Sequence, residues 1–115
     1  MEIYNAIIEY VNFKYPEEYK KVMELDLVNY DNWYMMDKGQ IGRRIEGLKK
    51  RYPSRKYIPF ARRDDCDDIA CFEDGMSDKV YIVHDFSSEG YELRQQYEHF
   101  RMWFYEVVQR AIEDE

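Results

Sequence analysis

The stretch "FARRDDCDDIACF", residues 60–72, is the part of the chain that best indicates the fold. An apolar segment leads into it, four aspartates surround Cys66 in its middle, and an apolar run leads out of it. Aspartate favours turns because its side chain bonds to nearby backbone amides. The stretch therefore predicts two strands, residues 56–62 and 67–72, that are joined by a short acidic turn.

A third strand is predicted at residues 79–86, where both alternating faces are largely apolar. A strand with two apolar faces is usually central and covered on both sides. Gly75 lies in the connection before it, and glycine readily adopts the positive φ that tight turns require. These three strands predict an antiparallel meander. A shorter aromatic strand is predicted at residues 33–36, after a turn at residues 29–32.

Apolar residues at helical spacing predict four helices around this sheet. Pro16 suits the first turn of the second helix, whereas Asp37 caps the third helix and Pro53 ends it. Gly42 and Gly47 weaken the third helix because glycine has a low helix propensity. The expected extents of the four helices are residues 3–11, 16–25, 38–52 and 93–111.

Helices followed by a meander and a closing helix are typical of an α+β fold. We therefore predict an antiparallel β-meander sheet that is packed by N-terminal helices and a long C-terminal helix. The chain has 115 residues, of which 45% are hydrophobic and 17% aromatic, and this is enough for one packed core. No repeat or linker divides it, so a single domain of residues 1–115 is expected.

The chain is acidic, with 24 Asp and Glu against 17 Lys and Arg and a net charge of -7. This balance disfavours nucleic acid as a partner and favours a protein with a basic surface. No segment has the ~18 uninterrupted apolar residues of a membrane span, and Glu2 lies where a signal peptide would carry positive charge. Cys66 and Cys71 are too far apart along one strand to form a disulfide. We expect a cytoplasmic protein with reduced thiols that does not associate with membranes.

The acidic turn could be a metal site, a catalytic acid cluster or only a turn. A divalent cation needs several oxygen ligands that converge on one point, whereas neighbouring side chains on a strand or an open turn diverge. General acid catalysis needs a buried carboxyl group, and nothing apolar interrupts this run. We favour a solvent-facing turn without a metal. The alternative is a metal-dependent hydrolase that uses Asp64, Asp65, Asp67 and Asp68.

Other catalytic arrangements are disfavoured by the sequence. His84 and Asp85 are neighbours on a predicted strand and should point to opposite faces. The aspartates around Cys66 should raise the pKa of its thiol, and Cys71 is expected in the core. The chain has neither a glycine-rich phosphate loop nor a nucleophile elbow. We therefore predict no catalytic residue and no cofactor, and a protein that is not an enzyme.

Three segments, "YIPFARRDDCDDIACF", "KVYIVHDF" and "YEHFRMWF", occur in an order that resembles the SUKH superfamily. In that family an "ipFA" strand leads through an acidic turn into a second strand, and a helix with an "sF..W" pattern ends the domain. Residues 58–61 match the first pattern, and Phe100 with Trp103 or Phe104 matches the last. Cys66 stands where the family's turn commonly has glycine, a residue that tolerates positive φ better.

The resemblance implies a non-enzymatic binding protein. Many bacterial members of the family neutralise a toxin, often a nuclease, and fungal members regulate cell-wall synthesis. The expected function is therefore that of an immunity-type protein that binds a toxin domain with a basic surface. The alternative is a regulatory or scaffolding module without a toxin partner. The candidate partner-binding residues are Asp64, Asp65, Asp67, Asp68, Asp74, Met102 and Tyr105.

Overall fold

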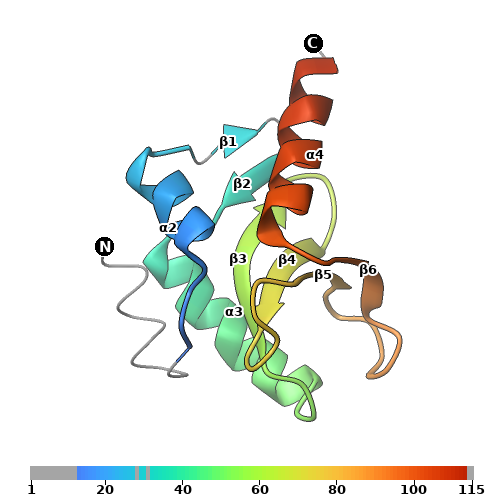
Figure 1. The fold of residues 1–115 in the computed structure, drawn as a ribbon. Helices are drawn as coiled ribbons and strands as arrows, with labels where there is room; N and C mark the ends of the chain where they lie inside the picture. Colours follow the sequence, from blue (N-terminus) through green and yellow to red (C-terminus); the bar gives the residue numbers. More distant parts are fainter. Residues whose placement is uncertain (1–12, 28, 31, 114–115) are drawn as a thin grey trace.

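The computed structural model describes residues 13–27, 29–30 and 32–113, so the helix predicted at residues 3–11 lies outside the described residues. Figure 1 shows the sheet in the middle of the molecule with the helices around it. The described elements, in chain order, are α2 (Glu17–Glu24), β1 (Asn29–Tyr30), β2 (Trp33–Met35), α3 (Lys38–Arg51), β3 (Tyr57–Arg63), β4 (Asp68–Glu73), β5 (Val80–His84), β6 (Leu93–Tyr97) and α4 (Phe100–Glu113).

The six strands form one sheet in the order β1-β2-β3-β4-β5-β6, and every neighbouring pair is antiparallel. This is the predicted meander, and the predicted α+β fold class is confirmed. Strand β5 lies between β4 and β6, and residues 80–83 are buried, as expected for a strand that is covered on both faces. Residues 29–30, predicted as part of a turn, instead pair with β2 as strand β1.

The helices cover different faces of the sheet. Phe72 of β4 stacks on Phe60 with ring centroids 4.3 Å apart, and it also contacts Tyr19 of α2 and Phe100 of α4. Tyr57, whose strand neighbour Ile58 pairs with Phe72, instead contacts the ring of Tyr52 at the end of α3. Because neighbouring side chains on a strand point to opposite faces, α2 and α4 cover one face and α3 covers the other.

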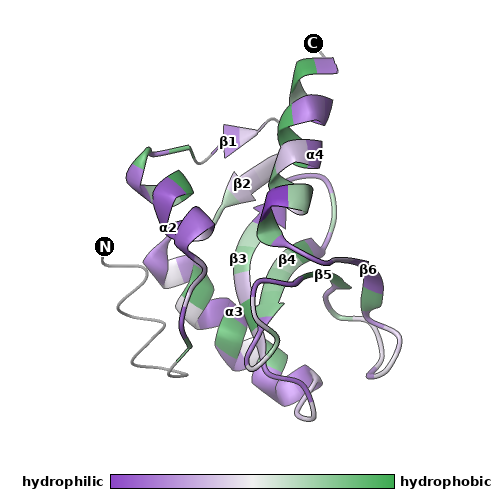
Figure 2. Ribbon diagram, viewed as in Figure 1, coloured by the Kyte–Doolittle hydropathy of each residue, from purple (hydrophilic) through white to green (hydrophobic). Residues whose placement is uncertain are grey.

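Helix α3 begins at Lys38, as predicted, and ends at Arg51, one residue before the predicted end. The Asp37 side chain accepts a hydrogen bond from the Gln40 amide at 2.9 Å, and the Gln40 side chain accepts one from the Asp37 amide at 3.0 Å. This reciprocal cap satisfies two amide groups that have no partner inside the helix. Green and purple alternate along α3 and α4 in Figure 2, which is the pattern of helices with one apolar face. None of the described helices is long and apolar enough to cross a membrane.

The prediction that residues 93–111 form one helix is wrong at its start. Residues 93–97 form strand β6, which pairs with β5, and the helix begins only at Phe100. Leu93 and Tyr97 are four residues apart, a spacing that also fits one face of a short strand, because both positions are even steps along it. The Asp78 side chain, in the turn before β5, lies 3.0 Å from His99 Nδ1 and accepts a hydrogen bond from the Phe100 amide at 3.4 Å. A residue distant in sequence therefore helps to set the start of α4.

Candidate functional site

In the acidic turn between β3 and β4, two of the carboxylates pair with the arginines that precede them. Arg63 donates two hydrogen bonds of 2.8 Å to the Asp65 carboxylate, and Arg62 lies 3.6 Å from Asp64. The side chains of Asp64 and Asp65 remain more than half exposed. The arginines therefore order the turn and leave the carboxylates accessible to another molecule.

The Asp68 carboxylate, on the first residue of β4, lies 2.7 Å from His84 Nδ1. Among residues 13–27, 29–30 and 32–113, no three His, Cys, Asp or Glu side chains converge closely enough to hold a metal ion. Cys66 does not adopt a positive φ, so the turn forms without the glycine that the resemblance would place there. Desolvation, followed by the charge of Asp68, raises the pKa of the Cys66 thiol, and this direction matches the prediction.

The other predicted partner-binding residues lie elsewhere on the molecule. Asp74 is in the turn after β4, so the length of that strand, about 20 Å, separates it from Asp68. Met102 and Tyr105 lie on α4, with 49% and 64% of their surfaces exposed. The structure thus groups the four aspartates of the acidic turn and places Asp74 at the opposite end of the sheet.

The outward face of α4 carries a stripe of large apolar side chains. Tyr105 lies about 160° around the helix axis from the buried Trp103, so it points to solvent. Ile112, which sequence reasoning missed, is 71% exposed on the same side as Tyr105. We call Met102, Tyr105 and Ile112 the α4 stripe. The base of the acidic turn reaches one flank of this helix, where Arg63 lines a small cavity with Val107.

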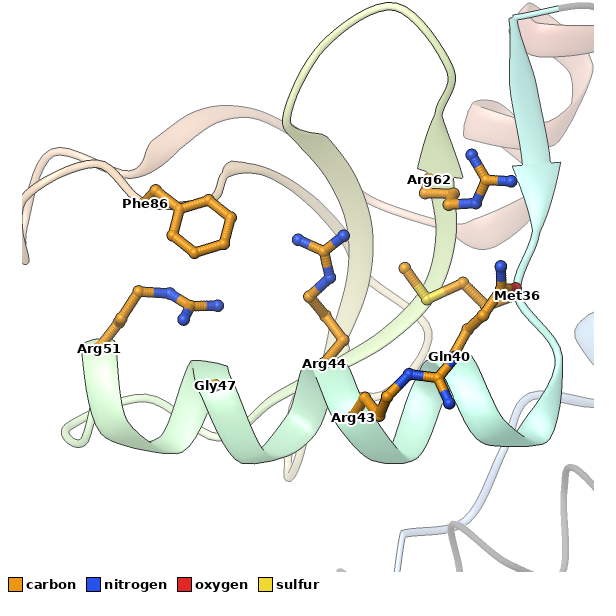
Figure 3. A pocket seen from close by; sticks show the side chains of 8 residues that line it. All are labelled: Met36, Gln40, Arg43, Arg44, Gly47, Arg51, Arg62 and Phe86. Carbon is orange, nitrogen blue, oxygen red and sulfur yellow. The ribbon is translucent and has the colours of Figure 1, made fainter.

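A basic pocket between α3 and the end of β5 was not predicted. Arg44 and Arg51 rise from α3, Phe86 lies across from Arg51, and Arg62 of β3 lies at the far side of the cavity from Phe86 (Figure 3). The cavity has a volume of 450 Å³. We call it the arginine pocket, and the residues that line it are Met36, Gln40, Arg43, Arg44, Gly47, Arg51, Arg62 and Phe86.

A buried carboxylate, that of Asp85, orders two of these arginines. Arg51 donates to both Asp85 oxygens at 2.7 Å, and Arg44 donates to Oδ2 at 2.8 Å. Asp85 is 1% exposed, and its Oδ1 also accepts a hydrogen bond from the Phe86 amide at 2.9 Å. Burial alone would raise the pKa of Asp85, but the bonds from Arg51, Arg44 and the Phe86 amide outweigh it and hold the pKa below its ordinary value.

Phe86 is held over the pocket in an unfavourable backbone conformation. Its φ is +71°, a region that bulky L-residues rarely adopt, and the residue is 63% exposed. The Arg51 guanidinium lies 4.1 Å from the centre of the ring. Backbone strain of this kind costs about 1–3 kcal/mol and tends to occur at functional sites. The cation–π contact and the hydrogen bond that the Phe86 amide donates to Asp85 offset part of that cost.

Gly47 creates the space in which the Arg51 side chain lies. A Cβ at this position would be 2.6 Å from Nη2 and 2.8 Å from Nη1 of Arg51, which is closer than van der Waals contact allows. At Gly42, by contrast, a Cβ would meet no atom within 4 Å. One of the two helix-weakening glycines is therefore explained by the arginine pocket. Nothing in the structure explains Gly42.

These two glycines give a matched pair of substitutions on one helix. We expect Gly42→Ala to raise the free energy of unfolding by about 1 kcal/mol, because alanine has the higher helix propensity and enters open space. Gly47→Ala should give no gain or a loss, because the added methyl group displaces the Arg51 guanidinium from Asp85. Urea unfolding of both variants measures the difference. Equal gains would show that Arg51 moves freely.

The sequence contains only a weak signal for the arginine pocket. Arg44 and Arg51 are seven residues apart, so a helix places them on one side. The residue that both arginines contact is Asp85, which directly follows His84. As alternation along a strand predicts, these two neighbours point to opposite faces: His84 contacts Asp68, whereas Asp85 contacts the arginines. Only the packing of α3 against the sheet shows that Asp85 meets them.

Comparisons with protein-family models, curated proteins and solved structures give no match. The resemblance to the SUKH superfamily therefore stays a prediction that depends on the three quoted segments.

Proposed function

We propose that the protein is a non-enzymatic, immunity-type inhibitor that binds a bacterial toxin and thereby neutralises it. The observation that carries the proposal is the α4 stripe. Its three side chains are about half to three quarters exposed, on a helix whose opposite face, at Phe100 and Trp103, is fully buried in the core. Exposed apolar and aromatic side chains flanked by polar groups are typical of protein-binding surfaces.

The charge of the protein supports a basic partner. The net charge is -7, and the acidic turn beside α4 presents Asp64 and Asp65 in positions that Arg62 and Arg63 hold in place. Acidic surfaces accelerate association with basic ones and select against acidic partners. Nuclease toxins carry basic substrate grooves, so a toxin of this class fits the charge, and its binding should weaken as the salt concentration rises.

The decisive experiment expresses this protein with the product of a neighbouring toxin-like gene. We expect co-purification, protection of cells that express the toxin, and a Kd that rises with salt concentration. Stable binding to a protein partner without protection would instead identify a regulatory or scaffolding module. Neither binding nor protection, with a partner shown to be toxic and folded, would remove the proposal.

Tyr105 tests the α4 stripe directly. Tyr105→Ala should weaken toxin binding by about tenfold or more, because exposed tyrosines at the centre of an interface often contribute 1–2 kcal/mol or more. Its matched control is Tyr91→Ala, since Tyr91 is 82% exposed and lies in the loop between β5 and β6. Isothermal titration calorimetry measures both. Equal effects of the two substitutions would place the interface away from α4.

A further inference from the structure

The arginines of the arginine pocket carry more positive charge than the carboxylates around them neutralise. Arg44 and Arg51 share one buried carboxylate, that of Asp85. Arg62 lies 3.6 Å from Asp64, which is largely exposed to solvent, and Arg43 makes no ion pair with any described residue. Four arginines thus line a cavity whose one buried counter-charge is already bonded to two of them, in a protein with a net charge of -7.

The donors that remain free of the Asp85 carboxylate suit an oxyanion. Arg51 uses Nε and Nη2 for Asp85, and Arg44 uses Nη1, so each retains further N–H groups. Because Asp85 holds both side chains in place, they are ordered before a ligand arrives. Guanidinium groups bind phosphate and carboxylate oxygens in pairs, and this makes preordered arginines common in phosphate sites.

The size and the apolar part of the pocket indicate a ligand larger than a single ion. The cavity volume of 450 Å³ lies in the range of small-molecule sites and exceeds the space that one phosphate fills. Phe86 and Met36 provide its apolar lining, at opposite ends of the cavity (Figure 3). The Arg51 guanidinium covers one face of the Phe86 ring at 4.1 Å, and the other face, on a residue that is 63% exposed and held at a φ of +71°, leaves a flat surface against which a planar group can stack.

We propose that the arginine pocket binds a small phosphorylated molecule, with its phosphate on the arginines and a planar apolar group on Phe86. This site is distinct from the α4 stripe proposed for the toxin and shares only Arg62 with the acidic turn, where Arg62 pairs with Asp64. It lies with α3 on one face of the sheet, whereas α4 covers the other. The site therefore does not depend on the proposed function, and either can fail alone.

The test uses the full chain and a minimal series of probes. Isothermal titration calorimetry at pH 7.5 compares phenyl phosphate, inorganic phosphate, phenol and benzoate. We expect phenyl phosphate to bind with a Kd of about 1 mM or tighter, and about tenfold more tightly than inorganic phosphate. Phenol should not bind. No binding of phenyl phosphate would overturn the proposal, and benzoate binding as tightly as phenyl phosphate would overturn the assignment to phosphate.

Three substitutions locate the binding. Phe86→Asn should reduce phenyl phosphate affinity to that of inorganic phosphate without lowering the urea midpoint, because asparagine tolerates positive φ. Arg43→Gln should weaken both phosphates by about tenfold. Arg101→Gln, on α4, makes the same change in net charge and should leave affinity unchanged. If Arg101→Gln weakens binding as much as Arg43→Gln, the attraction is diffuse and there is no site at the arginine pocket.

Discussion

Replacing Asp85 by alanine is expected to lower the free energy of unfolding by about 3–5 kcal/mol. The substitution removes three charge-assisted hydrogen bonds of 2.7–2.8 Å and leaves Arg44 and Arg51 without their shared counter-charge. It also removes the bond to the Phe86 amide, which holds the turn after β5. Urea unfolding followed by circular dichroism measures the loss.

Asp85→Asn removes the negative charge but keeps the size of the side chain, so it separates the contributions of charge and packing to the free energy of unfolding. Asparagine fills the same volume and still accepts a hydrogen bond from the Phe86 amide, so we expect a smaller loss than with alanine. Arg44 and Arg51 are each 27% exposed, and water can partly solvate them when the carboxylate is absent. A loss below about 1 kcal/mol for Asp85→Ala would show that the cluster contributes specificity or ligand binding and little stability.

The same carboxylate makes stability depend on pH in the acid range. The pKa of Asp85 in the folded protein lies below 3.8, its ordinary value. The folded state therefore binds the proton less readily than the unfolded chain, and the stabilisation is fully present above pH 3.8. It is lost as the pH falls through the folded-state pKa. Asp85→Asn should remove this part of the acid dependence, measured as urea midpoints between pH 5 and pH 2.

Replacing Phe72 by alanine is the second change with a large expected effect, again about 3–5 kcal/mol of unfolding free energy. Phe72 is fully buried, and five aromatic rings surround it within 6.0 Å between centroids. The rings come from segments before and after Phe72 in the sequence, including Tyr19 of α2 and Phe100 of α4. Alanine would leave a cavity that so many rigid rings cannot fill by small movements.

Tyr105→Ala is the matched control for this cavity. It also removes an aromatic ring, but Tyr105 is 64% exposed, so the expected change is within about 0.5 kcal/mol. Urea unfolding of both variants at one temperature measures the contrast. Similar losses for Phe72→Ala and Tyr105→Ala would mean that the rings around Phe72 do not form a packed core.

Local patterns predicted the elements that depend on neighbouring residues. The acidic turn, the strands on either side of it and helix α3 with its Asp37 cap all follow from spacing, turn chemistry and capping. The pattern at residues 93–97 was ambiguous, since a spacing of four fits a strand as well as a helix. Pairing with β5 resolves it, because the sheet supplies hydrogen bonds that an exposed polar segment would otherwise make with water.

The sequence by itself determined the α+β class, the meander of central strands and the acidic turn, because each depends on residues within a few positions of one another. Only the tertiary structure decided where opposite charges meet. Asp85 lies 41 residues from Arg44 and 34 from Arg51, and their contact exists because α3 packs on β3 with its arginines facing the turn after β5. The start of α4 likewise depends on a residue distant in sequence, because the Phe100 amide donates a hydrogen bond to Asp78. Contacts between distant residues depend on how the layers stack, and no local pattern contains that information.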